Sequence, residues 1–336
     1  MLGAPSASCT ATQKTQRTAA AAAFAKGMPA TRKRYFDTHR SATARKRFVA
    51  QQKARLTTLR AAAACTVPPA TTTATATTTP QAPSLAFVFG SGLDAPTQDT
   101  VRSYFDRSTT DELALTGVAV SNAQVFVSTD AAWLAQQECD TLGYSNAGCY
   151  TSTTSRWTSG YSIAVGGPGF VSAYWAAPDF QHDPPWEIQK ILAHELFHVM
   201  QAQLDHLNES TTPPDVVRAA GPVWLIEGAA EYIGYRVTGD VGLQGYGTSL
   251  AQQKSCARQF SVPLDQLLTY AQPQSYCLFE VAVDHLVAEA PGGVHGLINY
   301  YTALGAGTAW PDAFKLAFGK SVEDYYADFA AYRTTL

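Results

Sequence analysis

The sequence has few charged residues and no long uninterrupted apolar segment. Of its 336 residues only 15% are charged, whereas 46% are hydrophobic. This balance excludes a wholly disordered chain and is sufficient for a sizeable buried core. No stretch reaches the roughly 18 apolar residues that a membrane-spanning helix requires, so no transmembrane segment is expected. A conventional signal peptide is also lacking, because Thr18–Ala25 is short and only weakly apolar.

Acidic residues are almost missing from the start of the chain. Residues 1–66 contain 13 of the 24 Lys and Arg but a single acid, Asp37, which gives a formal charge of +12. The remainder contains 11 bases and 26 acids, or −15. Residues 1–65 are therefore interpreted as a basic N-terminal extension, partly helical or disordered. It could contact an anionic surface, serve as a removable pro-segment or organelle transit peptide, or be only a solvated extension. A specific nucleic-acid partner is not expected.

Residues 66–83 are rich in Pro, Thr and Ala and predict an extended linker. We expect one α+β domain over 84–336, in which a small mixed sheet and metal helices (84–240) precede a helical lobe (241–336). Strands are expected at 85–89, 124–128, 161–165 and 170–175, and helices at 97–107 and 130–141. In the lobe, helices are expected at 246–257, 263–270, 275–290, 293–304, 308–318 and 321–334.

The stretch Ile191–Gln201 contains the pattern His-Glu-x-x-His within a run typical of a helix. Residues four apart lie on the same helical face, so His194 and His198 can direct both imidazoles at one point. Two imidazoles are two of the three protein ligands of a catalytic zinc site, and Glu195 beside them can take a proton from metal-bound water. The alternative is a helix with two solvated histidines. The apolar residues around the motif disfavour that alternative, because they indicate a buried helix.

A second helical run, Trp224–Tyr232, offers the third ligand. Glu227 and Glu231 are four apart on one face, and Gly228–Ala230 are small enough to let this helix approach the first closely. We therefore expect Glu227 on the metal. Glu231, one turn further on, is expected to accept a hydrogen bond from the free ring N–H of a ligand histidine, with His194 as the first choice.

These two motifs, His-Glu-x-x-His and Trp-Leu-x-Glu-Gly-x-Ala-Glu-Tyr, resemble those of the gluzincin zinc metallopeptidases. Their spacing is similar to that of bacterial collagenase-type and peptidase MA-like members, and the resemblance covers roughly residues 160–335. It implies a zincin-like fold that binds one Zn²⁺ per chain through His194, His198 and Glu227. By the same resemblance, Glu195 is the general base and Glu231 supports a ligand.

The resemblance also has implications for the rest of the site. Metzincins are excluded, because their glycine and third histidine would fall at Gln201 and Leu204. A gluzincin needs a donor for the developing oxyanion. Tyr276 is the candidate by resemblance, with simple packing as its alternative role and His285 and His295 as weaker choices.

The strand nearest the metal helix is expected to pair with an extended substrate backbone. The candidate for that edge strand consists of Phe170, Val171, Ser172, Ala173, Tyr174 and Trp175.

The six cysteines lie away from the His-Glu-x-x-His motif, so a zinc site does not explain them. Proximity in sequence favours the pairs Cys139–Cys149 and Cys256–Cys277, which leaves Cys9–Cys65 around the basic segment. Disulfides imply an oxidising compartment. We therefore expect a secreted or cell-surface protein, although no conventional signal peptide is visible.

The sequence thus predicts a secreted zinc metallopeptidase that cleaves a peptide or protein substrate. Two other functions stay open. One is a catalytically inactive zinc-containing binding protein, and the other is a surface-tethered protein that acts through its basic N-terminal region. An intact Glu195 favours the enzyme, since a site that only holds a metal has no need of that base.

Overall fold

The computed structural model describes most of the chain beyond the linker. The chain divides into two units after Thr77, and every described residue belongs to the second unit. The described ranges are 85–144, 146–159, 161, 163–165, 169–206, 219–240, 245–269 and 275–336. The expectations for the basic extension, for the linker and for the pair Cys9–Cys65 therefore lie outside the described residues.

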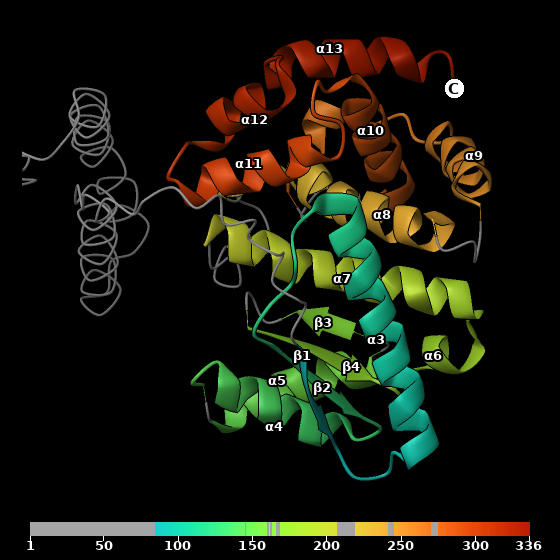
Figure 1. Ribbon diagram of the computed structural model, residues 1–336, viewed down its shortest axis with the longest axis vertical. Coiled ribbons are helices and arrows are strands. Elements are labelled where there is room, and N and C mark those ends of the chain that lie inside the picture. The colour runs from blue at the N-terminus through green and yellow to red at the C-terminus, as the bar shows by residue number, and fades with distance from the viewer. Residues whose placement is uncertain are drawn as a thin grey trace, which may run out of the picture. The chain divides into compact units, whose positions relative to one another are not determined.

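A mixed four-stranded sheet lies in the lower half of this unit as drawn in Figure 1, between α-helices, with the strand order β1-β2-β4-β3. Its strands are β1 (Leu85–Phe89), β2 (Ala123–Ser128), β3 (Ile163–Val165) and β4 (Phe170–Tyr174). The pairs β1–β2 and β2–β4 are parallel, whereas β3 runs antiparallel to β4. All four strands lie close to their predicted positions, and the expectation of a fold that mixes helices with a small sheet is confirmed.

The prediction that Phe170–Trp175 forms an edge strand is wrong. Strand β4 pairs with β2 on one side and with β3 on the other, so it lies inside the sheet. Its burial agrees with an interior position, since Phe170, Val171 and Ala173 are almost wholly excluded from solvent. Among the described strands, β1 and the three-residue strand β3 form the two edges. Whether a strand is interior depends on what folds back beside it, and here β3 does so.

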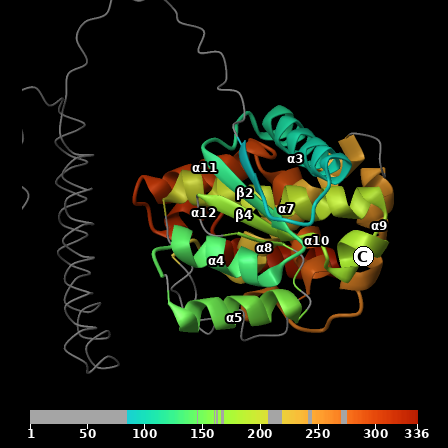
Figure 2. The same ribbon diagram turned by 90° about the horizontal axis from the view of Figure 1, so that it is seen from below.

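Helices cover both faces of the sheet. Side chains of a strand alternate between its faces. On β2, Phe126 packs with Leu134 of α4 (Ala131–Thr141) and Trp157 of α5 (Ala147–Thr158), whereas Val125 and Val127 join the main core. Figures 1 and 2 show α4 and α5 on one side of the sheet and α7 (Pro185–Asp205) on the other, with α3 (Ala95–Thr116) crossing nearby.

The two helices that carry the predicted metal ligands, α7 and α8 (Val223–Asp240), pack against each other (Figure 1). A short helix α6 (Pro178–His182) precedes α7. Pro185 is the first residue of α7, where a proline is tolerated because the first N–H groups of a helix have no partner. The helix ends at Asp205, because the next residue, His206, has a left-handed φ of 56° that stops the α-helical path. The next helix, α8, contains the second motif.

The C-terminal lobe is helical, as predicted. Its helices are α9 (Tyr246–Ala257), α10 (Tyr276–Glu289), α11 (His295–Gly305), α12 (Trp310–Phe318) and α13 (Val322–Arg333). The helix expected at 263–270 is wrong, since only the 3₁₀ turn η2 (Leu264–Gln266) forms there. The backbone leaves the helical region at Leu267, which has φ −98° and ψ 55°. The carbonyl oxygen of Leu268 accepts a hydrogen bond from the N–H of Val223 at 3.1 Å, which satisfies an otherwise unpaired donor at the start of α8.

Two disulfides connect neighbouring helices, and both predicted pairs are confirmed. Cys139–Cys149 joins α4 to α5, and Cys256–Cys277 joins α9 to α10, with Cα–Cα distances of 6.1 and 6.0 Å. None of the helices in the described part of the chain is long and apolar enough to cross a membrane.

Candidate metal centre

Close packing of α7 on α8 brings the two predicted motifs together. A Cβ atom placed on Gly234 of α8 would lie only 2.7 Å from the carbonyl oxygen of Lys190 on α7, so the glycine permits this approach. The expectation that Gly228 serves the same purpose is wrong. Gly228 faces α10 instead, where an added Cβ would lie 2.5 Å from the carbonyl oxygen of Phe279. Glycines on α8 thus adjust its distance to both neighbours.

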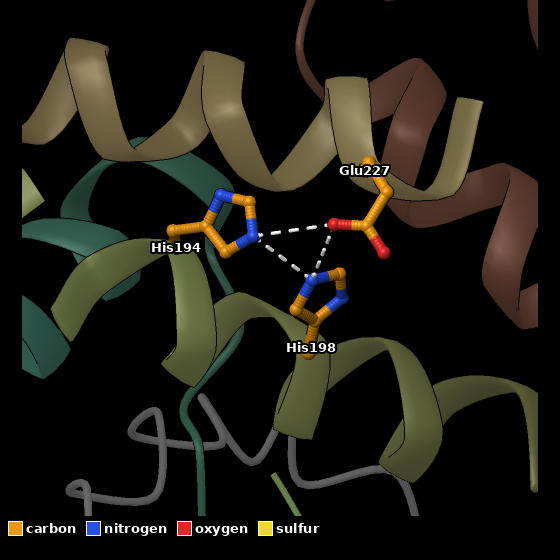
Figure 3. Close-up of side chains that lie close together, drawn as sticks. All are labelled: His194, His198 and Glu227. Atoms are coloured by element: carbon orange, nitrogen blue, oxygen red, sulfur yellow. Dashed lines mark hydrogen bonds and ion pairs between the residues drawn. The ribbon is translucent and has the colours of Figure 1, made fainter. Parts of the chain in front are cut away.

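Three side chains from these helices point at one another (Figure 3). The Nε2 atoms of His194 and His198 are 3.1 Å apart. Glu227 Oε2 lies 3.4 Å from Nε2 of His194 and 3.3 Å from Nε2 of His198. Among the described residues these three form a group that could hold a metal ion. The structure therefore places the predicted ligands together.

Each histidine is held from behind through its other ring nitrogen. His194 Nδ1 lies 3.1 Å from Glu231 Oε1, and the same carboxylate oxygen accepts a hydrogen bond from Lys190 Nζ at 2.7 Å. His198 Nδ1 lies 2.7 Å from Gln201 Oε1. The position of Glu231 agrees with the expectation that it contacts His194. An acceptor behind each ring keeps a proton on Nδ1 and leaves the Nε2 lone pair facing the centre.

This donor set fits a cation. Two Nε2 lone pairs and a carboxylate oxygen, all within about 3.5 Å, repel one another unless a positive charge lies between them. Two imidazoles with one carboxylate form the ligand set of several catalytic zinc sites, which keep a further position for water or substrate. The residues present thus suit Zn²⁺ better than Ca²⁺ or Mg²⁺, which prefer oxygen ligands.

The pKa values of the same groups reflect the negative charge that the carboxylates bring to the centre. Burial alone lowers the pKa of His194, but the carboxylates of Glu227 and Glu231 outweigh burial and raise it to about 10. Burial opposes ionisation of Glu231, yet Lys190 and His194 lower its pKa to about 2. His198 and His194 hold the pKa of Glu227 well below its ordinary value against the same cost of burial. The site attracts a positive charge, which is a proton or a metal cation.

Glu195 lies on α7 between the two histidines and shares their electrostatic environment. Burial raises the pKa of its carboxyl, and the charge of Glu227 adds to the rise, whereas His194 and His198 oppose it. A carboxylate with a raised pKa is a stronger base than an exposed one, which suits proton transfer near neutral pH.

Tyr276 is the first residue of α10 and lies beside the centre. Its ring centroid is 6.3 Å from that of His194, and the residue is 41% exposed. Burial of the hydroxyl, followed by the charges of Glu227 and Glu231, raises its pKa above the ordinary value. The hydroxyl therefore keeps its proton at neutral pH and is available as a hydrogen-bond donor. This placement favours a role for Tyr276 as a hydrogen-bond donor over a role in packing alone.

The two weaker candidates for an oxyanion donor are engaged elsewhere. His295 Nδ1 lies 3.2 Å from the carbonyl oxygen of Thr116. His285 belongs to a second group of possible metal ligands with Glu289 and Asp328. That group already contains a cation, because Lys320 Nζ lies 2.5 Å from Glu289 and 3.0 Å from Asp328. We interpret this second group as an ion-pair network rather than a metal centre.

Two residues of the centre were missed in the sequence, Lys190 and Gln201. Both lie on the face of α7 that carries the histidines, since Lys190 is four residues before His194 and Gln201 is three residues after His198. Helical periodicity places them there, but their partners depend on how α8 and α11 pack against α7.

Comparison of the chain with protein-family models, with curated proteins and with solved structures gives no match.

Proposed function

We propose that the protein is a zinc-dependent peptidase of gluzincin type that hydrolyses peptide bonds of a peptide or protein substrate. The observation that carries this proposal is the convergence of His194, His198 and Glu227, with Glu195 adjacent on the same helix. A centre that served only to stabilise the fold would be complete with its ligands. The additional carboxylate, with a pKa raised by burial, is the group that a hydrolase needs.

The residues of the chain divide the chemistry between them. Bound zinc supplies a Lewis acid that polarises a carbonyl group and lowers the pKa of water. Glu195 accepts the proton of the attacking water on a carboxylate oxygen and then donates it to the leaving amine. Tyr276 donates its hydroxyl proton in a hydrogen bond to the oxygen on which negative charge develops. Peptide hydrolysis by this route forms no covalent bond between substrate and protein.

We propose that the substrate backbone pairs with the free side of strand β3. It lies next to α7 and pairs with β4 on one side only among the described residues. An extended peptide can add to the other side through backbone hydrogen bonds, whereas β4 already has a strand on each side. We therefore assign the substrate-pairing role that was predicted for Phe170–Trp175 to Ile163–Val165 instead.

The disulfides support an exported protein. Cys139–Cys149 and Cys256–Cys277 are both formed, and such bridges persist in oxidising compartments. We therefore propose secretion or display at a cell surface.

The test compares wild type with Glu195→Gln in zinc content and in hydrolysis of a quenched fluorescent peptide library. The substitution keeps the shape and the ligands but removes the base. Zinc should stay near one per chain while turnover falls by at least about 10²-fold, the scale of general-base contributions. Glu187→Gln, two helical turns before His194 on the same helix, is the matched control and should keep its activity.

Two results would support the other functions. Zinc without turnover in wild type would favour a metal-containing binding protein. Loss of all hydrolysis on deletion of residues 1–83, with the zinc content unchanged, would show that the basic region is required for function. Hydrolysis that survives this deletion would rule out a protein that acts through its basic region alone.

A further inference from the structure

Gln201 connects three parts of the molecule near the candidate metal centre. Its Oε1 lies 2.7 Å from Nδ1 of His198, on its own helix. Its Nε2 donates hydrogen bonds to the carbonyl oxygen of Ile226 on α8 at 3.0 Å and to the hydroxyl of Tyr301 on α11 at 2.7 Å. The residue is only 4% exposed, and its bonds to Ile226 and Tyr301 are buried.

The partners fix the orientation of the amide. If the oxygen and nitrogen of the Gln201 side chain were exchanged, the oxygen would face the carbonyl oxygen of Ile226, and two acceptors would meet in a buried place. The observed orientation satisfies both N–H groups and leaves Oε1 directed at His198. Since an amide oxygen only accepts, Nδ1 of His198 is the donor.

We infer that Gln201 is a positioning residue that fixes the tautomer of His198 and the location of Glu227. This inference rests on the proposed metal-dependent function. With its proton on Nδ1, His198 presents an unprotonated Nε2 to the centre, which is the form that binds a metal. Ile226 directly precedes Glu227, so the bond from Gln201 to its carbonyl oxygen ties the third ligand to the helix of the first two. The bond to Tyr301 anchors the amide to the C-terminal lobe.

The chain offers a matched control two residues away. Gln203 also lies near the end of α7 and binds the segment between α3 and β2 through both polar atoms of its side chain. Its Nε2 donates to the carbonyl oxygen of Ser121 at 2.6 Å, and its Oε1 accepts from the N–H of Ser121 at 3.3 Å. None of these contacts involves a residue of the metal centre. Loss of its bonds should affect folding stability but not the metal.

The experiment measures the zinc affinity of the full chain by competition with a chromophoric chelator, for wild type, Gln201→Met, Gln201→Glu and Gln203→Met. Histidine labelled with ¹⁵N also reports, in each protein before zinc is added, whether the ring proton of the neutral His198 is on Nδ1. Gln201→Met should weaken zinc binding by about 10–100-fold, the range found when outer partners of ligand histidines are removed. Gln201→Glu restores an acceptor for Nδ1 and should bind zinc more tightly than Gln201→Met. Gln203→Met should bind zinc as wild type does.

The possible results separate this inference from the proposed function. If wild type binds and uses zinc but Gln201→Met binds it equally tightly, the positioning role is overturned and the peptidase proposal stands. Equal weakening in Gln203→Met would also overturn it, because the effect would then be general destabilisation. If wild type binds no zinc, both proposals fail. If Gln201→Met does not fold, Gln201→Glu provides the test. An unchanged zinc affinity in that variant, together with an unprotonated Nδ1 of His198, would contradict the positioning role of Gln201.

Discussion

Lys190 Nζ lies 2.7 Å from Glu231 Oε1, so a cation on α7 is paired with the carboxylate on α8 that faces His194. Both side chains are largely buried, with exposed fractions of 14% and 7%. Burial makes each charge costly unless the other is present. The pair therefore keeps Glu231 ionised and able to accept a hydrogen bond from the imidazole.

Lys190→Met should weaken zinc binding without removing a ligand. The substitution leaves the Glu231 carboxylate buried without its cation, so the carboxyl protonates more readily and holds His194 less well. We expect a loss of about 10–100-fold in zinc affinity, measured by chelator competition. Lys315→Met, at an exposed position of α12, is the control and should have no effect. Unchanged affinity in Lys190→Met would contradict a supporting role for the pair.

The stability of the metal-free protein should depend on pH on both sides of neutrality. The pKa of His194 is raised from 6.5 to about 10, so its contribution is complete below pH 6.5 and is lost as pH rises through 10. The pKa of Glu231 is lowered from 4.5 to about 2, so its contribution is complete above pH 4.5 and is lost as pH falls toward 2. Urea denaturation between these limits measures both effects.

His194→Gln provides the comparison for the alkaline side. The difference in unfolding free energy between wild type and this variant should shrink as pH rises from 6.5 toward 10. A difference that stays constant over that range would show that the pKa of His194 is not raised.

Tyr276→Phe should lower turnover while zinc stays bound. The substitution removes the hydroxyl that we propose donates to the developing oxyanion, and removal of such a donor costs about 10²–10³-fold in kcat. KM should change much less, because the interaction strengthens only in the transition state. Tyr144→Phe removes a hydroxyl from another exposed tyrosine, in the loop between α4 and α5, and serves as the control. Equal kcat in wild type and Tyr276→Phe would leave packing as the role of this tyrosine.

The two disulfides should differ in their effect on activity. Each closes a loop in the unfolded chain, so replacing either pair with serines should cost about 2–4 kcal/mol of stability. Cys277 directly follows Tyr276 in α10, whereas Cys139–Cys149 joins two helices on the far face of the sheet. Only the double variant Cys256→Ser/Cys277→Ser should also lose turnover under conditions in which it remains folded. Equal losses of turnover in both double variants would contradict a local effect on Tyr276.

The elements that depend on local patterns were predictable from the sequence. The strands have short runs of β-branched and aromatic residues, whereas α7 and α8 contain longer, mostly apolar runs that are typical of buried helices. Helix α5 was missed because residues 147–158 are rich in Ser and Thr, which are weak helix formers. Its first turn is held instead by the side chain of Asn146, which accepts from the N–H of Cys149, and by the disulfide to α4.

What could not be predicted depends on contacts between distant segments. The interior position of β4 follows from the return of β3 beside it, and nothing in Phe170–Tyr174 itself determines that pairing. In the site, the ligands were predictable because a helix places residues four apart on one face. Their supporting partners were only partly predictable. Glu231 shares a helix face with Glu227, whereas the hydrogen bonds of Lys190 and Gln201 require α8 and α11 to be in place.

We propose that His194, His198 and Glu227 together hold one zinc ion. The decisive measurement is the zinc content of the purified protein after dialysis against a weak chelator, compared with that of His194→Ala, His198→Ala and Glu227→Ala. Wild type should retain close to one zinc per chain, and each variant should retain far less, while circular dichroism confirms that the fold is kept. Wild type without zinc, or variants that retain it fully, would show that these three residues are not a zinc centre.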